Sequence, residues 1–169
     1  PWARAALGGA IIGGMAYLNP SVLGEGYNIT QEFLAQMDQH TVGWVLLFIL
    51  LKFIACCVTL GSGGVGGVFA PSLVLGSAVG MSFGLILGLT GWEGVAEPAA
   101  FALVGMAGMV TGVMHGPLTG VFLVMESTGG YSLILPLMLT ASSAMVTSSF
   151  LEVGSVYTRN LIFKGDLVK

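Results

Sequence analysis

Long apolar blocks, almost free of charged residues, alternate along this chain with short breaks rich in glycine, proline or polar residues. The blocks show no regular alternation of polar and apolar positions, which the strands of a membrane barrel require. The pattern therefore predicts an all-α protein with about eight helical segments. These segments are Ala3–Leu18, a short helix at about Ile29–Met37 inside the polar connection 21–40, Val42–Leu60, Phe69–Leu89, Ala99–Val113, Leu118–Ser127, Leu133–Leu151 and Tyr157–Val168.

Three of the breaks lie inside apolar sequence, namely Gly61–Gly67, His115-Gly116-Pro117 and Gly129-Gly130. Several of the neighbouring segments are shorter than the roughly 20 residues that a helix needs to cross a membrane. Non-helical backbone at membrane depth is tolerated only where it is buried in protein or lines a wet cavity. Broken helices of this kind indicate a binding site, as in transporters with discontinuous helices.

Composition places the chain in a membrane. Only 8% of its 169 residues are charged, 55% are hydrophobic, and the mean hydropathy is +0.93. Soluble domains carry roughly 25% charged residues, so this chain could not cover a water-facing surface. No charged residue lies in 53–92, in 98–125 or in 127–151. The sequence predicts a polytopic helical membrane protein.

Small residues recur at helical spacing. Gly76, Gly80, Gly84 and Gly88 lie four residues apart, and so do Gly108, Gly112, Gly116 and Gly120. Each set is expected to line one helix face and to allow another backbone to approach closely. We interpret both sets as packing surfaces, and the adjacent Cys56 and Cys57 as small packing residues.

The two ends of the sequence carry weaker signals. Arg159, Lys164 and Lys169 make the final tail basic, which favours a cytoplasmic C-terminus. Residues 1–20 lack the basic start of a signal peptide, and Pro1 stands where an initiator Met would be. We expect the chain to be part of a longer protein.

The stretch 61–71 carries the clearest chemistry. Its glycines can bring backbone N–H groups close to a ligand because they have no Cβ. Pro71 suits the first turn of a helix, where N–H groups are unpaired in any case. Unpaired amides and about half a positive charge at a helix N-terminus form an anion site, and their attraction is stronger at low dielectric. With no Lys or Arg in the stretch, an anion could also leave it.

Two other interpretations fit parts of this stretch. Gly61-x-Gly63-x-x-Gly66 has the spacing of a dinucleotide fingerprint, which needs a preceding strand and an acid about 20 residues further on. The flanks here are of membrane length, and the first acid is Glu93. An intramembrane serine hydrolase could pair Ser62 with His115, but Leu60 replaces the glycine expected before such a serine. Both interpretations are disfavoured.

Gly67-Val68-Phe69-Ala70-Pro71 resembles the Gly-x-Phe-x-Pro signature that opens a filter helix in the chloride channel/antiporter (CLC) family. The likeness continues in order and covers essentially the whole chain. Its further elements are Gly105–Gly108, His115–Gly120, Phe122–Glu126, Tyr131, Leu133–Pro136 and Tyr157. The resemblance implies the second inverted repeat of a CLC-type fold over residues 1–156. A final helix, 157–169, would lead to the cytoplasmic C-terminus.

The same resemblance implies an anion site. The backbone N–H groups of Val68 and Phe69 would coordinate a halide, and the Tyr157 hydroxyl would donate a hydrogen bond to it from the start of the last helix. Gly66, Gly67, Ala70 and Pro71 would form the filter loop. Without the resemblance, Tyr157 is more often a packing or interface residue and Phe69 a core aromatic.

Two charged residues and one histidine also interrupt apolar sequence. A charged residue within a membrane often has a function. Glu126, however, precedes a Ser-Thr-Gly-Gly break and is interpreted as an interface residue with local hydrogen bonds. His115 is expected at a loop or helix end. Lys52 could reach the interface or pair with an acid, and no role is assigned to it.

The implied function is selective transport of chloride as a passive channel or a chloride/proton antiporter, without enzyme activity or cofactor. The expected partners are the bilayer of a plasma or inner membrane, a missing N-terminal repeat and a second copy of the protein, but no nucleic acid. In this family the first repeat supplies a filter serine and a gating glutamate within Gly-Arg/Lys-Glu-Gly-Pro, and neither motif occurs here. Alternatives are another broken-helix anion transporter or a membrane scaffold without transport activity.

Overall fold

The computed structural model describes residues 2–18, 42–64, 66–91, 96–152 and 154–164, and within these ranges the regular secondary structure is entirely helical. The polar connection 21–40 and its expected helix Ile29–Met37 lie outside the described residues. The helices are α1 (Trp2–Leu18), α3 (Val42–Gly61), α4 (Phe69–Leu89), α5 (Pro98–Met114), α6 (Pro117–Thr128), α7 (Ile134–Leu151) and α8 (Arg159–Lys164).

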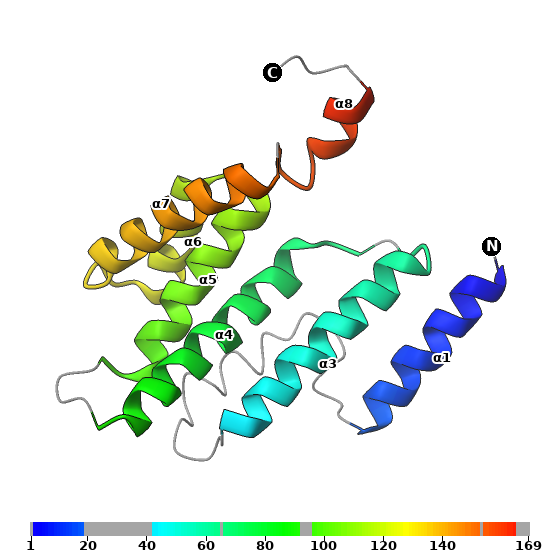
Figure 1. The fold of residues 1–169 in the computed structure, drawn as a ribbon, viewed down its shortest axis with the longest axis horizontal. Helices are drawn as coiled ribbons and strands as arrows, with labels where there is room; N and C mark the ends of the chain where they lie inside the picture. The colour runs from blue at the N-terminus through cyan, green and yellow to red at the C-terminus, as the bar shows by residue number, and fades with distance from the viewer. Residues whose placement is uncertain (1, 19–41, 65, 92–95, 153, 165–169) are drawn as a thin grey trace.

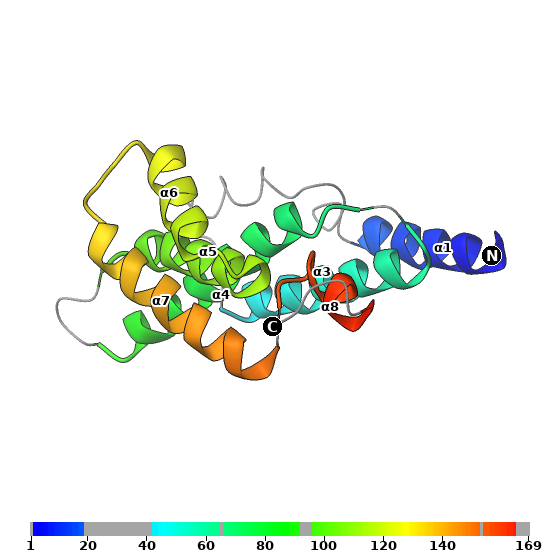
Figure 2. The ribbon, with the colours of Figure 1, turned by 90° about the horizontal axis from the view of Figure 1, so that it is seen from above.

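Three of these helices, α3, α4 and α7, are long and apolar enough to cross a membrane. The helix α5 is shorter at 17 residues, and α6 has only 12. Helices α1, α3 and α4 follow one another side by side, and α5 joins α4 to the pair α6 and α7 (Figure 1). Seen from above, α1 lies at one end of the molecule and α6 and α7 at the other (Figure 2).

Helices α4 and α5 are antiparallel and in backbone contact. A Cβ added at Gly80 would collide with the Phe101 carbonyl, and one at Gly105 would collide with the Gly76 carbonyl. Further along, a Cβ at Gly84 would lie 2.9 Å from the Pro98 Cα. Residue numbers rise along α4 while those of the contacting residues fall along α5. The start of α4 therefore lies beside the end of α5.

The glycine repeats only partly form the predicted faces. Of the first set, 76, 80 and 84 meet α5, whereas a Cβ at Gly88 would meet nothing within 4 Å. The second set does not lie on one helix, because the break at 115–117 separates Gly108 and Gly112 on α5 from Gly120 on α6. Gly120 still packs against the Ala107 carbonyl of α5, so close approach is kept across the break.

Two buried clusters hold the helices together. One joins α4, α5, α6 and α7, and the other joins α3, α4 and α5. Helices α4 and α5 contribute to both clusters and therefore connect the two halves of the described structure. The first cluster contains Leu73, Met106, Ala107, Val110, Val121, Val124, Met125, Leu137 and Ala141, and the second contains Val45, Phe48, Val74, Ala78, Met81 and Ala102.

The breaks between helices follow from backbone conformation. His115 ends α5 in the left-handed region at φ 55°, Gly116 caps the next helix, and Pro117 is its first residue. Proline suits that place because its missing N–H would have no partner in the first turn. Gly129 ends α6 at φ 64°, where glycine carries no Cβ penalty. The expectation that His115 lies at a helix end is confirmed.

The last helix differs from its prediction. The segment expected at Tyr157–Val168 begins as α8 at Arg159, and residues 165–169 lie outside the described part. Ser155 causes the delay, because its carbonyl accepts hydrogen bonds from the Thr158 and Arg159 amides and its hydroxyl accepts one from Thr158 N–H. The chain therefore turns once before the helix starts, and Tyr157 lies in that turn.

Candidate functional site

The first turn of α4 presents backbone donors. Val68 precedes the helix with φ −79° and ψ −19°, and no side chain caps it. The Val68 carbonyl accepts the Ser72 amide at 3.1 Å, which closes the first helical turn. Within the described ranges, no acceptor takes a hydrogen bond from the amides of Val68, Phe69 or Ala70. These donors can therefore serve a ligand at the positive end of the helix dipole.

The glycine segment before α4 continues the end of α3. The Ser62 and Gly64 amides donate to the Val58 and Thr59 carbonyls, and Gly63 adopts φ 88°. A Cβ at Gly64 would lie 2.8 Å from the Thr59 carbonyl oxygen, so this reversal requires glycine. The tight turn leads the chain out of α3 and toward the start of α4.

Helix α1 supports this turn from outside. Gly8 is buried, and a Cβ there would lie 2.5 Å from the Ser62 Cβ. Next to this contact lies an open cleft of about 410 Å³ between the start of α1 and the end of α3. The cleft is lined by Trp2, Arg4, Ala5, Gly61, Ser62 and Gly63.

The predicted filter residues differ in burial. Gly66 and Gly67 are exposed, whereas Val68, Ala70 and Pro71 are half-buried. Phe69 is also half-buried, and its ring packs against the cluster that joins α4 to α7. Packing of the ring therefore holds the first residue of α4 in place. The backbone N–H of the same residue remains available as a hydrogen-bond donor.

Tyr157 approaches the same end of the molecule. The amide of its neighbour Val156 donates to the Val113 carbonyl in the last turn of α5 at 3.2 Å. Because the start of α4 also lies beside the end of α5, the turn with Tyr157 and the amides of 68–69 share one end of the helix group (Figure 1). The Tyr157 side chain is 55% exposed and makes no hydrogen bond within the described structure.

Sequence reasoning missed one polar connection beside this region. Ser148 of α7 lies 2.7 Å from the Gly112 carbonyl oxygen and 2.7 Å from His115 Nε2. A polar residue on the buried side of an apolar helix was the only available signal. The sequence could not show that Ser148 and His115 would meet, because 33 positions separate them.

The two charged residues within apolar sequence, Lys52 and Glu126, have different environments. Lys52 is only 4% exposed and lies on the same face of α3 as the buried Val45 and Phe48. Glu126 is exposed on α6, one residue after the buried Met125. Neither residue belongs to the group formed by the start of α4 and the Tyr157 turn.

Comparison with known proteins gives the family. Residues 1–149 match the sequence profile of the family described as voltage gated chloride channel. The chain belongs to this family. The CLC resemblance inferred from the glycine-rich signature is therefore confirmed, and so is an all-helical membrane protein of CLC type.

Relatives match nearly the whole length of this chain in sequence. It is 36% identical over 94% of its length to a ClcB-like chloride channel protein of Ralstonia nicotianae. It is 35% identical over 95% of its length to the voltage-gated ClC-type chloride channel ClcB of Escherichia coli K12. It covers only 36% and 38% of these relatives, so it spans little more than a third of their length.

A solved structure shows the same fold. The crystal structure of a slow cyanobacterial Cl⁻/H⁺ antiporter matches 75% of this chain with a TM-score of 0.68 and 31% identity. The match covers 30% of that antiporter chain. Family membership and the apolar helices together make this chain part of an integral membrane protein.

Proposed function

We propose that this chain forms part of a chloride pathway, in which the amides of Val68 and Phe69 and the Tyr157 hydroxyl bind the anion. The observation that carries the proposal is the start of α4, whose first amides have no acceptor in the described part of an almost charge-free stretch. Helix-end amides attract a halide without a buried cation, so that the ion can also be released. In this proposal the filter loop shapes the path by which the anion reaches these donors. The loop consists of Gly66, Gly67, Ala70 and Pro71.

Tyr157→Phe in the full-length protein tests the site. Loss of the hydroxyl should raise the Kd for chloride or bromide several-fold, up to about tenfold. One hydrogen bond contributes about 0.5–1.5 kcal/mol net, and more when a partner is charged. Isothermal titration calorimetry in detergent gives the Kd, and Tyr131→Phe is the matched control because Tyr131 is exposed in the turn between α6 and α7. An unchanged Kd would remove Tyr157 from the site.

The transport mode requires a separate measurement. The named relatives are chloride channels, whereas the solved structure is of a Cl⁻/H⁺ antiporter. Full-length protein in vesicles with a chloride gradient should move protons against their gradient if it is an antiporter. Chloride flux without proton movement would assign a passive channel.

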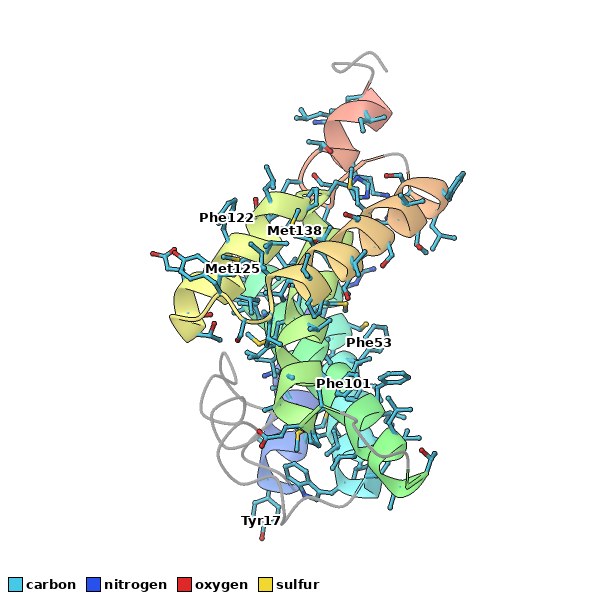
Figure 3. All side chains as sticks on the ribbon, turned by 90° about the vertical axis from the view of Figure 1, so that its left-hand side faces the viewer. Tyr17, Phe53, Phe101, Phe122, Met125 and Met138 are labelled. Carbon is cyan, nitrogen blue, oxygen red and sulfur yellow. The ribbon has the colours of Figure 1, made fainter. Side chains whose placement is uncertain are left out.

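The proposal extends to the assembly. Residues 1–156 would form the second repeat and 157–169 the start of a cytoplasmic C-terminus. A second copy would pack on α6 and α7, where Leu118, Phe122 and Leu139 are 65%, 60% and 73% exposed. Figure 3 shows Phe122 at the outer edge of α6, whereas Met125, three residues later, is buried.

A further inference from the structure

A short relay of hydrogen bonds joins α5 to α7. The Gly112 carbonyl oxygen can only accept, so the Ser148 hydroxyl must donate its proton to it across 2.7 Å. The Ser148 oxygen then accepts from His115 Nε2, also at 2.7 Å. This chain of donors places the imidazole proton of a neutral His115 on Nε2.

The relay ends where the Tyr157 turn is attached. Gly112 precedes Val113, whose carbonyl accepts the Val156 amide. Ser148 also lies in the last turn of α7, where its carbonyl accepts the Glu152 amide. The end of α5 is thus held on one side by Ser148 and carries the residue before Tyr157 on the other.

Two further sets of contacts in this turn are exposed or local. The ion pair between Arg159 and Glu152, at 3.4 Å, has both side chains about half exposed, and such pairs contribute little. The hydrogen bonds of Ser155 with Thr158 and Arg159 shape the turn internally but do not attach it to another helix. Among the hydrogen bonds of the described residues, the one from Val156 to Val113 attaches this turn to α5 and so contributes to the position of Tyr157.

We propose that His115 and Ser148 are positioning residues for the Tyr157 hydroxyl. By fixing the end of α5, they hold the Val113–Val156 hydrogen bond and the tyrosine after it beside the first amides of α4. The inference rests on the proposed function, because it gives the relay a role only if Tyr157 contacts the anion. His115 and Ser148 themselves do not contact the anion.

Ser148→Ala in the full-length protein removes both hydrogen bonds of the relay. It should raise the chloride Kd several-fold in calorimetry. Ser148→Thr keeps the hydroxyl and should restore the Kd. Ser149→Ala is the matched control, because Ser149 is exposed and its hydroxyl donates to the Met145 carbonyl of its own helix. An unchanged Kd in Ser148→Ala overturns the proposal while leaving the anion site intact.

Variants of His115 test the N–H that donates to Ser148. His115→Gln keeps an N–H at the end of the side chain and should keep the Kd close to that of the unmodified protein. His115→Leu removes the donor and should weaken chloride binding as Ser148→Ala does. If Gln and Leu weaken binding equally, the Nε2 donor has no positioning role and the proposal is wrong.

A double variant separates positioning from general loss of structure. If the relay acts through Tyr157, Ser148→Ala should have no further effect on the Kd in the Tyr157→Phe background. An equal loss in both backgrounds overturns the proposal, because the relay would then support the fold as a whole. If Tyr157→Phe alone leaves the Kd unchanged, Tyr157 is not part of the anion site, and the positioning role proposed for His115 and Ser148 is then also wrong.

Discussion

Glycine decides how closely α4 and α5 approach. At Gly76, Gly80 and Gly105 the facing helix contributes backbone atoms to the contact, which no larger residue could accommodate without a shift. The four-residue spacing predicted such packing, but it did not show which glycines meet a neighbour. Gly88 has the same spacing and meets nothing within 4 Å, because α4 has passed the start of α5 at Pro98 by that point.

Gly80→Ala should destabilise the full-length protein by about 1–3 kcal/mol, the usual effect of overpacking a tight contact. The added Cβ would collide with the Phe101 carbonyl, which is helix backbone and cannot move alone. Gly88→Ala adds the same methyl to the same helix in open space and should be neutral or slightly stabilising. Chemical unfolding in detergent micelles compares the two. Equal stability of both variants would contradict the contact.

Thr111 has a buried hydroxyl that lacks a hydrogen-bond partner within the described structure. Its side chain is fully buried in α5, and Oγ1 is the one buried side-chain nitrogen or oxygen that lacks a hydrogen bond in the described part of the chain. Thr111→Val should stabilise the protein by about 1 kcal/mol, since an unsatisfied buried polar group costs about 1–3 kcal/mol. Thr128→Val, which removes a hydroxyl bonded to Val124, should give no gain in the same unfolding assay. A loss of stability in Thr111→Val would disprove this account.

At the scale of elements, helix ends marked by glycine or proline were predicted better than the start of α8. The bounds of α4 agree with the prediction at both ends, and α5 and α6 agree to within one residue, because glycine and proline mark these ends in the sequence. The start of α8 was wrong by two residues. The Ser155 turn that delays it depends on local hydrogen bonds, and a serine before an apolar segment does not specify whether such a turn forms.

Gly129→Ala should shorten or destabilise the end of α6. Gly129 has φ 64°, and an L-residue in that conformation costs roughly 1–2 kcal/mol. Gly130→Ala is the control, since Gly130 has no positive φ and its nearest new contact would be Ser132 Oγ at 4.0 Å. Thermal unfolding should show a lower Tm for Gly129→Ala only. Equal Tm values would mean that the α6 cap tolerates a side chain.

At the scale of the whole molecule, burial identifies α4 as the central helix. Of its apolar window 56% is buried, against 22% for α3 and 11% for α7. This difference was not predictable, because hydropathy does not show which span is surrounded by protein. The sequence did predict the charge-free start of α4. The meeting of the Tyr157 turn with the end of α5 depends on tertiary contacts and was not predictable.

Residues 1–169 alone should not support selective chloride flux. In the proposed site the chain contributes one helix start and one tyrosine, it spans little more than a third of its relatives, and its sequence contains neither the gating-glutamate motif nor the filter serine expected of the first repeat. A dehydrated halide needs ligands around it, because each lost water must be replaced by a donor at low dielectric. Vesicles containing the 169-residue chain should therefore release no more chloride than empty vesicles.

A full-length protein that includes this sequence is the control in the same vesicles and should release chloride. Its flux should fall when Tyr157→Phe is introduced, which connects the control to the proposed site. Since a misfolded chain would also be silent, circular dichroism must first show that the 169 residues are helical in the vesicles. Selective chloride release by the helical chain alone would show that one helix start suffices, and would contradict a pathway shared with the rest of the protein.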